Sequence, residues 1–103
     1  MDLAAGISAF NEYRYTLAVE ELTPLAEAGD PDAMYYLACI RNPNFEPIIQ
    51  EHLVDVDEAA CWYVAAAKLG HAYATYELGK LAQYERRLQN YRRLIRKTSI
   101  IAP

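Results

Sequence analysis

The stretch that decides the fold is AACWYVAAAKLGHAYATYELGKL, residues Ala59–Leu81. It predicts one helix, a stop at Gly70 and the start of a second helix, because glycine accepts the left-handed backbone conformation that closes a helix. Small residues recur where two helices would touch, and large residues recur where a core would be filled. The small set is Ala59, Ala66, Ala67, Ala74 and Gly79, and the large set is Trp62, Tyr63, Leu69, Leu78 and Leu81.

Outside this stretch, the spacing of apolar residues predicts an all-helical chain, and no run alternates as a half-buried strand would. The expected helices span about residues 3–13, 15–28, 31–41, 56–69 and 72–96, with one helical turn near 48–52. The last helix is expected to be unbroken because residues 81–102 contain no glycine or proline. A break near 89–90 is the alternative.

Four acidic residues and one proline mark where these helices begin or bend. Asp2, Asp30 and Asp55 each stand where a carboxylate can cap a helix. Glu58 follows Asp55 by three residues, so the pair resembles a capping box in which Glu58 reaches back to the backbone. Pro24 removes one hydrogen bond inside the second helix and predicts a kink or a short break there.

The length of 103 residues allows one domain, and a hydrophobic content of 53% is enough for a packed core. Residues 1–103 are expected to form a single helical-repeat domain. Its parts are the repeats (1–83), an extension of the last helix (84–97) and a tail (98–103). The N-terminus has no basic segment before an apolar run, and no stretch is long enough for a membrane span. Together with two cysteines, expected as buried thiols, these features favour a cytoplasmic protein.

The net charge of −4 hides an asymmetry between the two parts of the chain. Residues 1–60 hold twelve acids and two bases, a balance of −10. Residues 61–103 hold eight bases and two acids, a balance of +6. An acidic body followed by a basic helix carries information about partners rather than about the fold.

Part of the chain repeats when it is shifted by 41 residues, which aligns residues 25–40 with residues 66–81. A helix-pair repeat of about this length is the signature of an α-solenoid. The matching pairs are Ala26 with Ala67, Gly29 with Gly70, Ala33 with Ala74, Tyr35 with Tyr76, and Leu37 with Leu78.

The repeat resembles a known family at specific positions. These are Ala59-x2-Trp62-Tyr63-x2-Ala66-Ala67-x2-Gly70-x3-Ala74-x3-Leu78-Gly79, which look like the pattern of Sel1-like repeats, relatives of tetratricopeptide repeats. The likeness covers about residues 5–83. It implies a short α-solenoid of about two helix-pair repeats, and we expect the long last helix to cap one end. Two departures are Ala38, where the family prefers glycine, and a long connection over 41–55 that lacks the family's paired glycines.

Catalytic and metal-binding chemistry are weakly indicated. No serine, histidine and acid occur at a suggestive spacing, and His52 and His71 are expected to be surface or capping residues. Cys39 and Cys61 form no C-x2-C pair and the histidines form no H-x3-H pair, so a structural metal site is not expected. We therefore expect neither enzyme activity nor a cofactor.

The chain is rich in tyrosine, with nine residues, and this excess is more informative about function than the histidines and cysteines. Tyr35 and Tyr76 each precede a core leucine by two residues, an offset that points them about 160° away from it on a helix. In tetratricopeptide-like folds the first helix of each pair lines the concave surface, and tyrosine suits such a surface because it offers a large contact area. The resemblance therefore implies a partner-binding groove, with core packing as the alternative role for any one residue. Its candidate residues are Tyr35, Tyr36, Tyr73, Tyr76, Glu77, Lys80 and Tyr84.

The basic run near the C-terminus has three interpretations. The first is a solvated helix face. The second is a contact with the protein's own acidic body or with an acidic partner, and the third is a nucleic-acid or membrane-surface site. The last is disfavoured because the whole chain is acidic and would repel phosphate. The run consists of Arg86, Arg87, Arg92, Arg93, Arg96 and Lys97.

These observations predict a cytoplasmic protein–protein interaction module or adaptor. The partner would bind the concave tyrosine-rich face and the acidic N-terminal half. By analogy with bacterial Sel1-like proteins, an immunity protein that neutralises a toxin, or an adaptor of a secretion system, would fit. A homodimer through the exposed repeat ends is compatible with the sequence. The alternative function is nucleic-acid or anionic-surface binding through the basic C-terminal helix.

Overall fold

The structure of the chain is a computed structural model. It describes residues 2–45 and 49–98, and within the last helix it describes side chains up to residue 90 and at Arg93. This part of the chain is all-helical, as the sequence predicts. The helices are α1 (Leu3–Asn11), α2 (Tyr15–Glu27), α3 (Pro31–Arg41), the short 3-10 helix η1 (Glu51–Leu53), α4 (Val56–Lys68) and α5 (Ala72–Thr98). Of the predicted turn near 48–52, residue 48 lies outside the described residues.

The predicted caps are confirmed. The Asp2 carboxylate accepts the N–H of Ala4, and the Asp30 carboxylate accepts two N–H groups of the first turn of α3. The Asp55 carboxylate accepts the N–H of Glu58 at 3.1 Å. The side chain of Glu58 does not reach back as expected; it bonds to Arg41 instead. These short-range bonds fix where α1, α3 and α4 begin, because they satisfy N–H groups that a helix leaves free.

Two glycines end helices as predicted. Gly29 after α2 has φ +101° and Gly70 after α4 has φ +88°, and only glycine adopts such values without strain. The short break that was one of the two outcomes predicted at Pro24 is absent, since α2 runs unbroken to Glu27. Pro24 stands in the last turn of α2, where a lost hydrogen bond has little helix left to disturb. The unbroken last helix is confirmed by α5.

Helices that follow one another along the chain pack together, and α1 also touches α3. Alanines with almost no exposure stand at these contacts, which confirms the predicted role of small residues. They are Ala18, Ala26, Ala33, Ala38, Ala59, Ala66 and Ala74. Two expectations from the opening stretch are wrong. Leu69 is exposed, and Gly79 has open space where a Cβ would stand.

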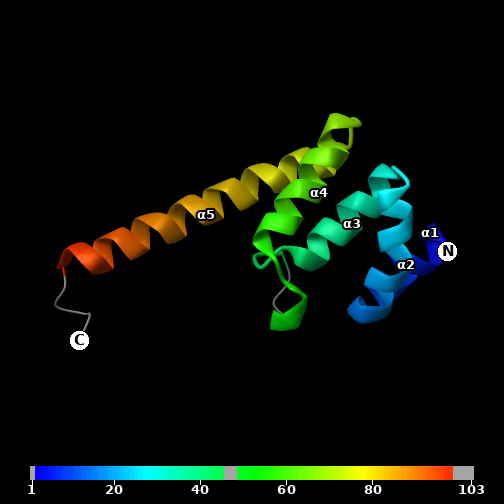
Figure 1. Cartoon of the computed structure of the whole chain (residues 1–103), viewed down its shortest axis with the longest axis horizontal. Coiled ribbons are helices and arrows are strands. Elements are labelled where there is room, and N and C mark those ends of the chain that lie inside the picture. Colours follow the sequence, from blue (N-terminus) through cyan, green and yellow to red (C-terminus); the bar gives the residue numbers. More distant parts are fainter. Residues whose placement is uncertain (1, 46–48, 99–103) are drawn as a thin grey trace.

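The first half of α5 lies against the body, and its second half runs clear of the other helices (Figure 1). The buried residues of α5 in the described part are Ala74, Glu77 and Leu81, all near its start. The molecule is consequently elongated, with extents of 53 × 27 × 18 Å. The helix expected to cap the repeats thus covers α4 with its first half only.

Gly6 and Gly79 offer a matched test of this packing. A Cβ at Gly6 would lie 2.6 Å from Cδ2 of the fully buried Leu22, whereas a Cβ at Gly79 meets nothing within 4 Å. We expect Gly6→Ala to lower the free energy of unfolding by about 1–2 kcal/mol, despite the better helix propensity of alanine. Gly79→Ala should raise it by about 0.5–1 kcal/mol.

Urea unfolding followed by circular dichroism measures both changes. Equal stabilisation by the two substitutions would contradict the close contact between α1 and α2.

Candidate functional site

The seven residues predicted to bind a partner differ in exposure. Tyr73 and Tyr76 are 69% and 64% exposed, and Lys80 is exposed as well. Tyr35, Tyr36 and Tyr84 are half-buried and pack against the core. Glu77 is buried, with 8% exposure. The structure therefore presents a small exposed group, Tyr73, Tyr76 and Lys80, supported by tyrosines that are anchored in the core.

The rings of this region form a continuous series of contacts, which we call the aromatic row. Phe10 on α1 contacts Tyr36 on α3 edge to face, with centroids 5.0 Å apart. Tyr36 contacts Tyr35 at 5.1 Å, and Tyr35 contacts Tyr73 at 6.1 Å. The full row is Tyr13, Tyr15, Phe10, Tyr36, Tyr35, His71 and Tyr73. It joins α1, the start of α2, α3 and the start of α5.

His71 connects α3 to α5 within this row. Its ring stacks on Tyr35 with centroids 4.7 Å apart and an interplanar angle of 18°. Its Nδ1 accepts the N–H of Ala74 at 3.2 Å, which caps α5. Since Nδ1 is an acceptor, the ring proton of the neutral imidazole is on Nε2, which lies 3.1 Å from an Asp32 carboxylate oxygen. The predicted capping role of His71 is confirmed.

Tyr35 and Tyr76 occupy matching repeat positions but different environments. Tyr76 projects into solvent as expected. Tyr35 is covered because His71 and Tyr73, from the next helix, lie against it. Burial raises the pKa of the Tyr35 hydroxyl, and the neighbouring Cys39 raises it further. No helix follows α5 in the described residues to cover Tyr76 in the same way.

Glu77 and Lys80 hold the exposed Tyr76 in place. Lys80 Nζ lies 3.5 Å from a Glu77 carboxylate oxygen and 5.2 Å from the centre of the Tyr76 ring. The lysine is therefore held by an ion pair and a cation–π contact at once. This arrangement orders Tyr76, so its ring loses less freedom when a partner binds.

A buried polar network lies beneath the aromatic row. Asn42 donates to the Tyr63 hydroxyl at 3.2 Å, and that hydroxyl donates to Cys39 Sγ at 3.3 Å. Burial raises the pKa of the Cys39 thiol from 9.0 to about 12, and nearby Glu77 adds to the rise. Burial likewise raises the pKa of Tyr63. All of these groups therefore stay neutral at physiological pH, which suits a structural network and not a reactive thiol.

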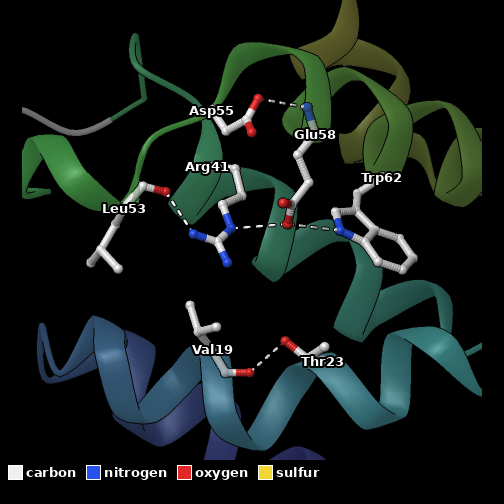
Figure 2. Close-up of polar contacts among 7 residues, drawn as sticks. All are labelled: Val19, Thr23, Arg41, Leu53, Asp55, Glu58 and Trp62. Carbon is white, nitrogen blue, oxygen red and sulfur yellow. Dashed lines mark hydrogen bonds and ion pairs between the residues drawn. The ribbon is translucent and has the colours of Figure 1, made fainter.

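Arg41 fastens the long connection between α3 and α4 (Figure 2). Its Nε donates to a Glu58 carboxylate oxygen at 2.9 Å, and its guanidinium also donates to the carbonyl of Leu53 at 2.9 Å. The indole N–H of Trp62 donates to the same Glu58 oxygen at 3.3 Å. Sequence reasoning missed this cluster because Arg41 and Glu58 are 17 positions apart in the chain and no periodic signal links them.

Beside this cluster, a groove of about 640 Å³ lies between α2 and α4. In Figure 2, Thr23 on α2 lies across from Arg41 and Glu58. The groove has acidic residues at its rim and part of Trp62 in its wall. Its lining residues are Thr23, Glu27, Arg41, Asp55, Asp57, Glu58, Cys61, Trp62 and Ala65. None of them belongs to the aromatic row, so the molecule has two separate candidate surfaces.

Comparisons of the chain with protein-family models, with curated proteins and with solved structures give no match. The resemblance to Sel1-like repeats therefore rests on the sequence pattern alone.

Within residues 2–45 and 49–98, no helix is long and apolar enough to cross a membrane. Over the same residues, no group of three histidine, cysteine or acidic side chains is arranged to hold a metal ion.

Replacing His71 tests its role in positioning α5. His71→Ala removes the cap and the stack on Tyr35, and we expect the free energy of unfolding to fall by about 1–2 kcal/mol. His71→Asn keeps a capping side chain and should recover part of that loss. The control is His52→Ala at an exposed position, which should change stability by less than about 0.5 kcal/mol. Equal effects of His71→Ala and His52→Ala in urea unfolding would disprove the positioning role.

The two cysteines should differ in reactivity. Cys61 is exposed and Cys39 is buried, so the expectation of two buried thiols is wrong for Cys61. At about pH 8 we expect one thiol of the native protein to react quickly with a chromogenic disulfide reagent, and two after unfolding. In Cys61→Ser the fast reaction should disappear. Rapid reaction of both thiols in the native protein would contradict the buried network.

Proposed function

We propose that this chain is a protein–protein interaction module that binds another protein through the exposed end of the aromatic row. The observation that carries the proposal is the pair of exposed rings, Tyr73 and Tyr76. Tyr73 contacts the half-buried Tyr35, and Lys80 lies over the ring of Tyr76. Exposed tyrosines with ordered support are typical of binding hot spots, because they bury a large area at a small entropy cost. Lys80 adds a charge that is already held in place.

We also propose that the architecture is a short α-solenoid of the Sel1-like type. Its support is that positions 41 residues apart behave alike. Gly29 and Gly70 both adopt positive φ, and Ala33 and Ala74 are both fully buried. The packing of each helix on its neighbour in sequence is what a repeat protein requires. In such an arrangement α1, α3 and α5 would line one face, which is the face that carries most of the aromatic row.

The biological role that fits this surface is that of an adaptor or of an immunity protein that neutralises a bacterial toxin in the cytoplasm. The acidic N-terminal half would favour a partner with a basic surface, because complementary charge accelerates association. The proposal includes no catalytic step and no cofactor.

Affinity capture from the source cells, with the whole chain as bait, tests the proposed function. The expected result is one stoichiometric protein partner that is lost with the double variant Tyr73→Ala/Tyr76→Ala. Two large exposed side chains should lower the affinity by at least tenfold, on the order of 1.4 kcal/mol or more. The matched control is Leu17→Ala/Leu69→Ala, which removes two exposed apolar side chains elsewhere and should leave binding unchanged.

Retention of a partner by the tyrosine variant would overturn the proposed surface. The alternative function, nucleic-acid binding through α5, is supported by the exposed Arg86, Arg87 and Arg93 on the projecting half of that helix. It would give salt-sensitive retention of DNA or RNA. That retention would persist in the tyrosine variant and disappear on neutralising these arginines.

A further inference from the structure

The groove between α2 and α4 combines an acidic rim with an apolar wall. Glu27, Asp55 and Asp57 stand around it, and none of them is paired with a base among the described residues. The one base in the groove, Arg41, is already paired with Glu58. The groove therefore has an uncompensated negative charge, which attracts a basic ligand and repels an acidic one.

The apolar wall continues along α4 beyond the groove. A second hollow of about 400 Å³ lies over Ala60, Cys61, Val64 and Ala65, and it ends at Lys68. Val64 and Cys61 are exposed. An elongated strip on one helix, acidic at one end and apolar along its length, has the shape and the chemistry to accept another helix.

The same chain supplies a helix with the complementary charge. Residues 86–97 contain six bases and no acid, and they lie in the half of α5 that runs clear of the body (Figure 1). Arg86, Arg87 and Arg93 are exposed. This half of α5 cannot enter the groove of its own molecule, because α5 is one continuous helix whose first turn is fixed beside α3 by His71. The two complementary features can meet only between two copies.

We propose that the acidic groove between α2 and α4 binds the basic half of α5 from a second copy of the chain. The exchange is reciprocal, so that each copy gives its helix and receives the other, and both grooves are filled in a closed dimer. Exposed ion pairs contribute little individually, so several of them together with the apolar strip give a weak, salt-sensitive dimer. This contact uses no residue of the aromatic row and leaves Tyr73 and Tyr76 free for the proposed partner.

Sedimentation equilibrium over a range of protein concentrations tests the dimer. The groove variant is Glu27→Lys/Asp57→Lys and the helix variant is Arg86→Glu/Arg87→Glu. We expect each variant alone to weaken dimerisation at least tenfold, since each reverses two attractive charges. Raising the salt from about 0.05 M to about 0.5 M should weaken the wild-type dimer similarly. The control variant Glu12→Lys/Glu51→Lys makes the same change in net charge as the groove variant, at other exposed positions, and should leave the dimer intact.

Mixing the two defective variants gives the sharpest result. In the mixed pair, the lysine groove faces the glutamate helix, and the unchanged acidic groove faces the unchanged arginine helix. Both contacts are then complementary, so we expect the mixture to form a heterodimer although neither variant dimerises alone. Loss of folding or a general charge effect cannot produce this recovery.

Cys61 provides a local readout, because its exposed thiol lines the groove. Its reaction with a thiol reagent should slow as the wild-type concentration rises, and it should stay fast at all concentrations in both variants. A wild-type protein that is monomeric at low salt, or a dimer that neither variant weakens, would overturn the proposal. So would a monomer whose α5 retains DNA instead. Tyr73→Ala/Tyr76→Ala should leave the dimer unchanged, so failure of this contact and failure of the proposed function are distinguishable.

Discussion

Helix α3 is covered on two sides because alanines allow α2 and α4 to approach it closely. Ala33 and Ala38 on α3, Ala26 on α2 and Ala59 on α4 have almost no exposure, and α3 makes its main contacts with these two helices. Close approach lets larger side chains fill the remaining space and maximises dispersion contacts. The buried network, the aromatic row and the groove all depend on this arrangement, since each contains residues of α3 and of a neighbouring helix.

Hydrogen bonds and an ion pair then fix the segments that the alanine contacts do not hold in place. The long connection after α3 is held by Arg41, which bonds to both Leu53 and Glu58. Beneath it, Asn42, Tyr63 and Cys39 satisfy one another in the core, and unsatisfied groups there would cost about 1–3 kcal/mol each. These bonds order the N-terminal end of α4, and with it the acidic rim of the groove.

The two candidate surfaces differ in character and suit different partners. Tyr73, at the exposed end of the aromatic row, is held by its contact with Tyr35, and Tyr76 is held by Lys80, which is paired with Glu77. This preorganisation favours a tight contact of small area. The groove is negatively charged, which favours a salt-sensitive contact with a basic helix. A dimer through the grooves would display two copies of the aromatic surface, and paired sites raise the apparent affinity for a partner that can reach both.

The sequence by itself determined the helices and their ends, because the signals that start and stop a helix are local. These signals are the caps at Asp2, Asp30 and Asp55 and the stops at Gly29 and Gly70, and each one acts on backbone groups only a few residues away. It also placed Tyr76 at the surface and His71 at the start of a helix. Only the tertiary structure decided which side chains a neighbouring helix covers. Tyr35 is shielded while its repeat equivalent is not, Glu77 is buried, and Glu58 turns to Arg41. Those outcomes depend on partners far along the chain: Arg41 is 17 positions from Glu58, and His71 on the next helix lies against Tyr35. Periodicity has no information about contacts at such separations.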